Sequence, residues 1–304
     1  MPQAAKTNYK PNEIYSITMN LRKSIGENAP DIKEINEIIE NKKLIHYWLD
    51  DVITLFDPIE NKKKEIKLAR TIASGSNSIS VGNKIFIVGG FPATIEKNEM
   101  YELNLISNKL IQKTPMLKPK YHNTLCSANK YIYSVGGYDG LTSINNCEKY
   151  LISYDIWMPL PALKTERYGC AAFTFNDAYI YSLCGVNHSG MHINSVEKLI
   201  LNCGKWEYVE ILNMFSPRSS LYGIQISGNE AIVYGGFYGI WKRECYVLCM
   251  EGAAECKRIC DLTEDSVFVS CAAPVFDGLY VFNSDNKKVI HIYSIVDKMW
   301  TAVK

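Results

Sequence analysis

The sequence lacks several features that would point to particular classes of protein. No uninterrupted apolar run approaches the roughly 18 residues of a membrane span, and residues 1–20 hold no apolar stretch of signal-peptide length. We therefore expect a cytoplasmic protein without membrane insertion. The net charge is only +1, whereas dedicated nucleic-acid-binding domains are usually strongly basic. We accordingly expect no nucleic-acid partner.

Motifs of catalysis are also scarce. The chain has five histidines, and His188 and His192 stand four apart in a predicted loop, which is not the geometry of a metal site on a helix face. The glycine pairs end predicted strands and are not followed by helices, so they do not form a phosphate-binding loop. We predict that the chain is not an enzyme, and that it has no catalytic residues, metal or cofactor.

What the sequence does contain is a glycine pair that recurs with its surroundings about every 48 residues. Successive copies lie 47, 48, 51 and 48 residues apart, at Gly89, Gly136, Cys184, Gly235 and Asn283. The third copy keeps only one glycine of the pair and the last copy has lost both. A fixed period of this size indicates a repeat architecture.

Each repeat contains signals for four short strands. In the copy around Gly136, these are predicted at residues 121–128, 131–135, 147–153 and 156–160. Short strands at this spacing occur in sandwiches, barrels and propellers, and the superposed period selects an all-β propeller with four-stranded blades. The same pattern fits residues 71–114, 165–212, 216–260 and 266–303.

A partial repeat lies upstream, with strands predicted at 43–51, 52–58 and 64–69, which raises the expected number of blades to about six. The missing first strand of this repeat could be residues 13–21. Residues 31–43 predict a short amphipathic helix, which either caps the propeller edge or docks on another protein. We divide the chain into an N-terminal segment, 1–42, and a propeller, 43–304.

The repeats resemble kelch repeats, in which a basic or polar start precedes a strand, an apolar strand ending in two glycines, and a spaced Tyr and Trp. The segments 114–140, 160–185 and 216–237 carry this resemblance best. It covers roughly residues 43–304, and it departs from the pattern at Cys184 and at Asn283 and Ser284, which replace glycines.

The resemblance implies a fold more than a function. Kelch propellers mostly serve as interaction platforms, and many follow a BTB domain, for which the 42 residues before this propeller are too few. Others bind cytoskeletal filaments or act as scaffolds, and a few are copper radical oxidases. We expect a non-catalytic adaptor or scaffold of unknown oligomeric state. The alternatives are a structural subunit of a cytoskeletal assembly, and an enzyme with a metal or redox site at the channel mouth.

We expect a protein partner to bind where the linker before each first strand meets the loop after each glycine pair. Arginine and aromatic residues are enriched in binding hot spots. The candidates lean basic, which favours an acidic peptide, although arginine and tyrosine at strand starts can instead pack between blades. The candidate contact residues are Lys120, Tyr121, His122, Arg167, Tyr168, Arg218, Ser219, Tyr238, Trp241 and Arg243.

Four cysteines lie in one predicted hairpin, at Cys245, Cys249, Cys256 and Cys260. If residues 251–254 form the turn, Cys249 faces Cys256 and Cys245 faces Cys260, and all four share one face. The two pairs would then lie about 13 Å apart, too far for one tetrahedral zinc. Two disulfides are one alternative, and four reduced, buried thiols are the other.

Overall fold

The computed structural model describes residues 45–49, 51–57, 62–91, 98–250, 253–259, 261–262, 269–275, 278–283, 290–294 and 299–303. The chain divides into two compact units, Met1–Lys42 and Lys43–Lys304. The predicted helix at 31–43 and the predicted strand at 13–21 lie outside the described residues. In the described part no helix is long and apolar enough to cross a membrane.

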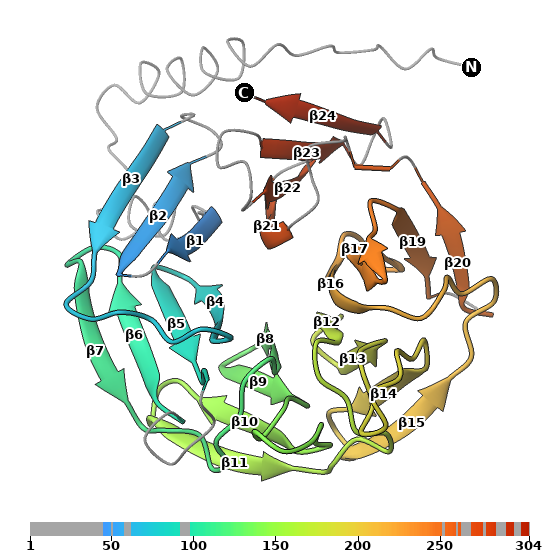
Figure 1. Ribbon diagram of the computed structural model, residues 1–304, viewed down its shortest axis with the longest axis horizontal. Coiled ribbons are helices and arrows are strands. Elements are labelled where there is room, and N and C mark those ends of the chain that lie inside the picture. Colours follow the sequence, from blue (N-terminus) through green and yellow to red (C-terminus); the bar gives the residue numbers. More distant parts are fainter. Residues whose placement is uncertain are drawn as a thin grey trace, which may run out of the picture. The chain divides into compact units, whose positions relative to one another are not determined.

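The described residues of the second unit form six antiparallel sheets, which we number as blades 1 to 6 (Figure 1). Blade 1 contains β1 (Ile45–Leu49), β2 (Val52–Asp57) and β3 (Lys62–Lys67). Blade 2 contains β4 (Asn77–Val81), β5 (Lys84–Val88), β6 (Met100–Asn104) and β7 (Lys109–Lys113). Blade 3 contains β8 (Thr124–Ala128), β9 (Tyr131–Val135), β10 (Cys147–Leu151) and β11 (Ile156–Leu160).

The remaining blades follow the same plan. Blade 4 contains β12 (Ala171–Phe175), β13 (Tyr179–Leu183), β14 (Val196–Ile200) and β15 (Lys205–Val209). Blade 5 contains β16 (Ser219–Gln225), β17 (Glu230–Tyr238), β18 (Ile240–Trp241), β19 (Cys245–Cys249) and β20 (Glu255–Arg258). Blade 6 contains β21 (Val269–Val275), β22 (Gly278–Asn283), β23 (Ile290–Ser294) and β24 (Met299–Val303).

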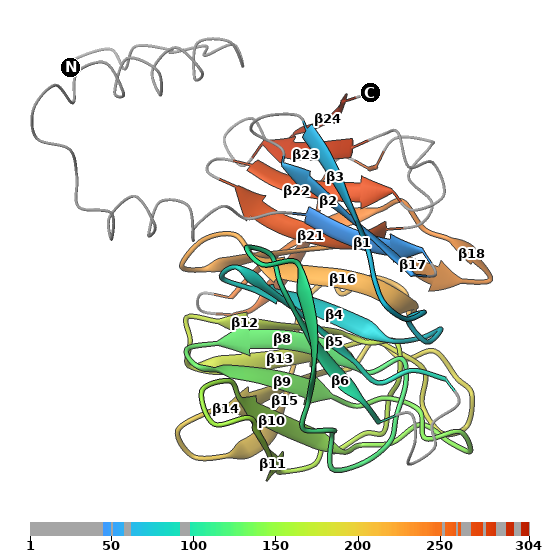
Figure 2. The ribbon, with the colours of Figure 1, turned by 90° about the vertical axis from the view of Figure 1, so that its left-hand side faces the viewer.

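The blades are arranged around a central axis, with their first strands innermost (Figure 1). The inner strands β4, β8, β12, β16 and β21 pack beside one another in this order, and β21 also packs beside β1. Figure 2 turns the ring so that blades 1 and 2 face the viewer. The prediction of a propeller with about six blades is confirmed.

The pattern of burial along each strand follows from its place in a blade. The second strands β9 (YIYSV) and β13 (YIYSL) are buried at every residue after the first, because neighbouring blades cover both of their faces. The outermost strands are more exposed and keep a buried tryptophan each, Trp157 in β11 and Trp206 in β15. The Trp206 indole donates to the Pro161 carbonyl at 2.8 Å, so it ties the outer strand to the preceding linker.

The recurring glycine pair is a joint between blades. The second glycine donates its N–H to a carbonyl of the next blade: Gly137 to Arg167 at 2.9 Å and Gly185 to Arg218 at 2.8 Å. A Cβ on Gly136 would lie 2.3 Å from the Arg167 carbonyl oxygen, and Gly136 has a φ of +59°. The backbone therefore approaches the next blade too closely for a side chain at this position.

Candidate functional site

The topology places two kinds of connection at one end of the ring. In blade 3, for example, β8 and β10 begin at this end and β9 and β11 finish there, because neighbouring strands are antiparallel. The linker that enters each blade and the loop after each glycine pair therefore lie on the same face, which we call the loop face. Backbone bridges join the two in blades 3 and 4, from Tyr121 to Tyr138 and from Tyr168 to Val186.

Three of the predicted contact residues lie beneath this face, inside the ring. The side chains of Lys120, Arg167 and Arg218 are almost completely inaccessible to solvent. Each pairs with a glutamate near the start of the third strand of its own blade. The ion pairs are Lys120–Glu148 at 3.3 Å, Arg167–Glu197 at 2.7 Å and Arg218–Glu244 at 2.7 Å.

The contacts of Arg167 show what these cations do. Its guanidinium donates to the Cys184 carbonyl at 3.1 Å and to the Ser195 carbonyl at 2.9 Å, as well as to Glu197. Glu197 in turn accepts the backbone N–H groups of Lys164 and Thr165. The pair therefore fixes the glycine turn, the third strand and the entering linker to one another.

The expectation that these three cations contact a partner is corrected by their burial. A carboxylate within each blade already pairs with the charge, and each cationic side chain is at most 2% exposed to solvent. Burial lowers the pKa of the Lys120 amine, and the neighbouring Glu148 opposes that shift. The alternative from the sequence is packing of arginine and tyrosine between blades, whereas the observed ion pairs lie within single blades.

Two residues beyond each cation, the backbone adopts a left-handed conformation in blades 3, 4 and 5, and Gly75 takes the same place in blade 2. These residues are linked by hydrogen bonds from blade to blade: His122 N to the Gly75 carbonyl at 3.1 Å, Gly169 N to His122 at 3.0 Å, and Ser220 N to Gly169 at 2.7 Å. His122 and Ser220 have φ values of +51° and +53°, which favour glycine. Strained non-glycine residues of this kind concentrate at functional sites.

Aromatic side chains gather on the loop face beside His122. Tyr121 lies 5.3 Å from Phe91 and 5.4 Å from Tyr138, measured between ring centroids. Tyr138 lies 5.2 Å from Tyr168 in an edge-on arrangement, and His122 lies 6.2 Å from Tyr168. These five rings connect the loops of blades 2, 3 and 4.

A second group continues across blades 4 and 5. His192 lies 5.3 Å from Tyr238 and 6.3 Å from Phe237, and Phe237 lies 5.2 Å from Trp241. The Ser219 hydroxyl, which is buried, lies 3.2 Å from Nε2 of His192. We call the two groups together the aromatic surface; it consists of Phe91, Tyr121, His122, Tyr138, Tyr168, His192, Phe237, Tyr238 and Trp241.

The loops that carry the aromatic surface also expose large apolar side chains. These are Leu141 at 88%, Ile240 at 67%, Met191 at 59%, Phe91 at 56% and Tyr238 at 49% exposed. Burial lowers the pKa of His122 and His192 below 6.5 and raises the pKa of Tyr121 and Tyr168. These four rings are therefore uncharged at neutral pH.

The structure thus brings together five of the ten predicted contact residues, Tyr121, His122, Tyr168, Tyr238 and Trp241. Arg243 lies half-buried just after β18. The sequence also indicated Phe237 as a residue of these loops, but it did not indicate Phe91, Tyr138 or His192. A signal for two of them was present, because the residue directly after the glycine pair is aromatic in three repeats, at Phe91, Tyr138 and Phe237.

The predicted cysteine arrangement is wrong by one residue. The hairpin pairs Cys249 with Glu255 and Leu248 with Cys256, and a shift of one residue moves a side chain to the other face of the sheet. Cys245 and Cys256 accordingly belong to different core clusters. Cys249 and Cys256 are free thiols, Cys245 is buried, and Cys260 lies outside the described residues.

The two histidines of the 184–195 loop do not converge. His188 lies 3.8 Å from Glu166, and His192 contacts Ser219 and Tyr238. Within the described part of the chain, no group of three or more His, Cys, Asp or Glu side chains is placed to hold a metal ion.

Comparison with known proteins agrees with the repeat pattern. The kelch motif family matches residues 119–164. Kelch-like protein 23 of Homo sapiens is 30% identical over 165 residues, 51% of this chain and 27% of that protein. Kelch repeat and BTB domain-containing protein 2 of Ectromelia virus (strain Moscow) is 31% identical over 112 residues, 36% of this chain and 20% of that protein.

The chain is similar to kelch-repeat proteins, and its described sheets form a propeller. The solved structure of YjhT supports the fold, with a TM-score of 0.62 over 75% of this chain and 83% of that one, at 13% identity. The matched regions span about a quarter or less of the two curated relatives. The similarity therefore supports a kelch-type propeller fold, and it does not transfer the activities of those whole proteins.

Proposed function

We propose that this kelch-repeat propeller is a non-catalytic adaptor or scaffold that binds a protein segment on the aromatic surface. The observation that carries the proposal is the concentration of neutral aromatic rings and exposed apolar side chains on adjacent loops of a rigid ring. Clustered exposed apolar side chains mark interaction sites, and tyrosine and tryptophan are enriched among hot-spot residues.

The chemistry of the surface favours an apolar or aromatic segment over an acidic one. The predicted preference for an acidic peptide depended largely on Lys120, Arg167 and Arg218, which are buried against glutamates. The rings that remain are neutral, and they offer stacking contacts and a few hydroxyl and imidazole groups. We therefore propose a partner segment that inserts aromatic or aliphatic side chains between the loops.

The other functions considered from the sequence have no specific support. A structural subunit of a cytoskeletal assembly would use several faces, whereas the ring contacts that link one blade to the next on the surface of the described residues lie on the loop face. An enzyme with a metal or redox site needs a converging set of ligands, which the described residues do not provide. We keep the interaction module as the single proposed function.

The proposal can be tested by selecting binders from a random peptide library on the purified propeller and measuring their affinities for variants. We expect the selected peptides to be rich in Trp, Phe, Leu and Met. Tyr121→Ala and Tyr238→Ala should each weaken binding at least 30-fold, about 2 kcal/mol, as for hot-spot residues. Tyr154→Ala is the matched control, because Tyr154 is equally aromatic and 73% exposed but lies in the turn at the opposite end of blade 3.

Equal affinity of the selected peptides for wild type, Tyr121→Ala and Tyr238→Ala would contradict the proposal. So would selected peptides that are dominated by Asp and Glu and bind with a steep dependence on salt, since that result indicates an electrostatic site. Circular dichroism of each variant establishes that the fold is retained before affinities are compared.

A further inference from the structure

Blade 2 contains an alanine where blades 3, 4 and 5 hold their buried cation. The equivalence follows from the second glycine of each pair, which lies against the residue in question. A Cβ built on Gly90 would meet the Cβ of Ala73 at 2.5 Å. The corresponding contacts are Gly137 with Lys120 at 3.3 Å, Gly185 with Arg167 at 3.3 Å and Gly236 with Arg218 at 2.9 Å.

The groups that accept hydrogen bonds from the cation are nevertheless present in blade 2. Glu99 stands where Glu148, Glu197 and Glu244 stand, at spacings of 49, 49 and 47 residues. The Gly89 carbonyl matches the Cys184 and Gly235 carbonyls, which accept from Arg167 at 3.1 Å and from Arg218 at 3.2 Å. In blade 2 the Gly89 carbonyl accepts instead from the Ser76 hydroxyl at 2.8 Å.

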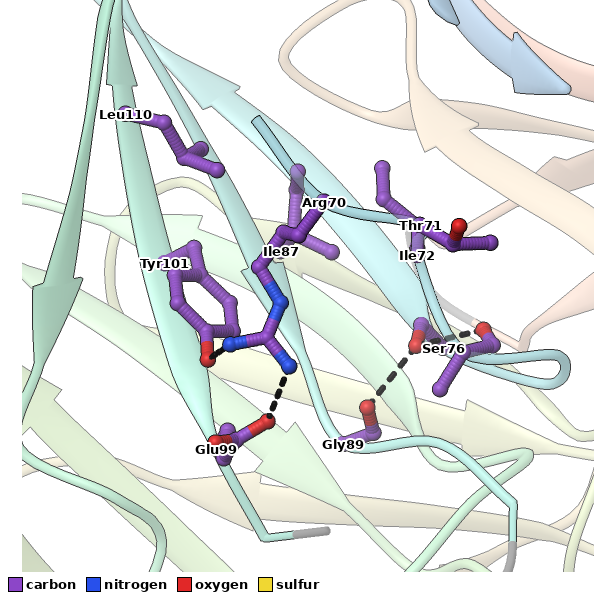
Figure 3. A pocket seen from close by; sticks show the side chains of 10 residues that line it. Arg70, Thr71, Ile72, Ser76, Ile87, Gly89, Glu99, Tyr101 and Leu110 are labelled. Atoms are coloured by element: carbon purple, nitrogen blue, oxygen red, sulfur yellow. Dashed lines mark hydrogen bonds and ion pairs between the residues drawn. The ribbon is translucent and has the colours of Figure 1, made fainter. Parts of the chain in front are cut away.

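In blade 2 the cation that pairs with Glu99 is Arg70, which lies between β3 and β4. Arg70 stands three residues before Ala73 in the sequence. Its guanidinium donates to Glu99 at 3.1 Å and to the Tyr101 hydroxyl, and it lies 4.5 Å from the centroid of the Tyr101 ring (Figure 3). The pair is accessible, with the side chains of Arg70 and Glu99 40% and 25% exposed, whereas Lys120 and Glu148 are both 0% exposed. Exposed ion pairs of this kind contribute little and exchange readily.

A cavity remains between these groups. Figure 3 shows Arg70 and Glu99 on one side and Ser76 and the Gly89 carbonyl on the other. Its volume is about 30 Å³, and it is lined also by Ile72, Ala73 and Tyr101. A space of this size holds one or two water molecules, and therefore an ammonium group; a guanidinium fits once Arg70 has moved outward. We call this cavity, with Glu99 at its base, the Glu99 slot.

We propose that the Glu99 slot binds a basic side chain, lysine or arginine, of the partner that occupies the aromatic surface. The incoming group takes the place that Lys120, Arg167 and Arg218 hold in their own blades, and Arg70 turns out to solvent. The slot adjoins the aromatic surface, because Phe91 donates its N–H to the Ser74 carbonyl at 2.7 Å and Gly75 packs against Tyr121 and His122. The inference rests on the proposed function in one respect: the basic side chain is taken to come from the protein segment that binds the aromatic surface.

The slot can be tested without knowing the partner, by titrating methylguanidinium chloride and methylammonium chloride into the propeller. Nuclear magnetic resonance signals of the Tyr101 ring and the Glu99 carboxylate report binding, and sodium chloride at equal ionic strength is the control. We expect saturable shifts in wild type. Ala73→Lys fills the slot from within, as Lys120 does in blade 3, and should weaken binding at least tenfold, as should Glu99→Gln. Arg70→Ala removes the competing cation and should tighten binding at least threefold.

Shifts that do not saturate in wild type, or that are the same in Ala73→Lys, Glu99→Gln and wild type, would overturn the proposal. If Ala73→Lys does not fold, Glu99→Gln and Arg70→Ala still give opposite expected changes and decide the question. Tyr121→Ala separates this inference from the proposed function, because it should weaken binding of the selected peptides at least 30-fold and leave methylguanidinium binding unchanged.

Discussion

Blades 2 and 4 contain the same glycine turn and the same third-strand glutamate, but they neutralise that glutamate in different ways. Blade 4 buries Arg167 against Glu197, with no exposed surface on either side chain. Blade 2 has Ala73 at the equivalent position, and Glu99 is reached by the exposed Arg70. One residue at the start of the first strand thus decides whether the space beside the turn is closed by the blade itself or remains open to other groups.

The comparison also shows how one set of residues stabilises the fold while a neighbouring set forms the proposed binding surface. Arg167 and Tyr168 are adjacent in sequence. Arg167 points into the ring and holds the turn, whereas Tyr168 lies on the aromatic surface beside Tyr138. Alternation of side chains along an extended segment separates the two roles over a single residue.

We expect the largest loss of stability from a substitution that removes the buried Arg167–Glu197 ion pair of blade 4. Arg167→Ala leaves Glu197 buried without its cation and deprives two carbonyl groups of a donor. We expect the free energy of unfolding to fall by about 3–5 kcal/mol, as for other broken buried ion pairs. Urea titration followed by circular dichroism measures this; a loss below about 1 kcal/mol would mean that the pair is not structurally important.

Among the described residues, blades 1 and 2 are joined through a neutral imidazole, that of His46, and not through an ion pair. His46 is buried, with Nε2 2.7 Å from the Ser78 hydroxyl and Nδ1 2.8 Å from the Ser80 hydroxyl. Burial lowers its pKa from 6.5 to about 4, so between these values the unfolded chain binds the proton more tightly. Stability that is fully present above pH 6.5 is therefore lost as the pH falls toward 4, by about 3 kcal/mol in total.

Unfolding free energies measured at several pH values, for wild type and for His46→Phe, test this prediction. The variant cannot titrate at this position, so the difference between the two proteins should change by about 3 kcal/mol between pH 7 and pH 4. Parallel pH profiles would show that His46 does not carry the pH dependence.

A smaller effect tests the joint between blades 3 and 4. Gly136→Ala places a Cβ 2.3 Å from the Arg167 carbonyl oxygen, whereas the nearest described atom to a Cβ on Gly204, in the turn between β14 and β15, is Cγ of Pro161 at 3.8 Å. Both residues have positive φ, which costs about 1–2 kcal/mol for alanine. We expect Gly204→Ala to lose only this amount and Gly136→Ala to lose clearly more. Thermal unfolding of the two variants side by side measures the difference, and equal losses would argue against a close joint between blades 3 and 4.

Much of the fold follows from the sequence, because the repeat fixes the strand positions independently of any one residue. The predicted strands at 131–135 and 156–160 coincide with β9 and β11, and the first strand begins three residues later than predicted, at Thr124. Residues 121–123 instead enter the blade from the linker, where Tyr121 bridges to Tyr138 and His122 takes a left-handed conformation. Local propensity does not distinguish such an entry from a strand.

The site was less predictable, because the sequence shows the type of a residue and not the direction of its side chain. Lys120 and Tyr121 are neighbours, and both residue types occur at binding surfaces and within cores. Only the glutamate about 28 residues later in the chain, at Glu148, indicates that Lys120 is buried, and that pairing depends on how the strands assemble. The Glu99 slot is visible only when blade 2 is compared with the other blades in three dimensions.

The most direct test of the contrast between closed and open blades is a pair of double-mutant cycles on the free energy of unfolding. One cycle combines Arg167→Ala with Glu197→Gln, and the other combines Arg70→Ala with Glu99→Gln. We predict a coupling free energy above about 2 kcal/mol for the buried pair and below about 1 kcal/mol for the exposed pair. Equal coupling in the two cycles would contradict the account, because blade 2 would then be as firmly closed by Arg70 as blade 4 is by Arg167.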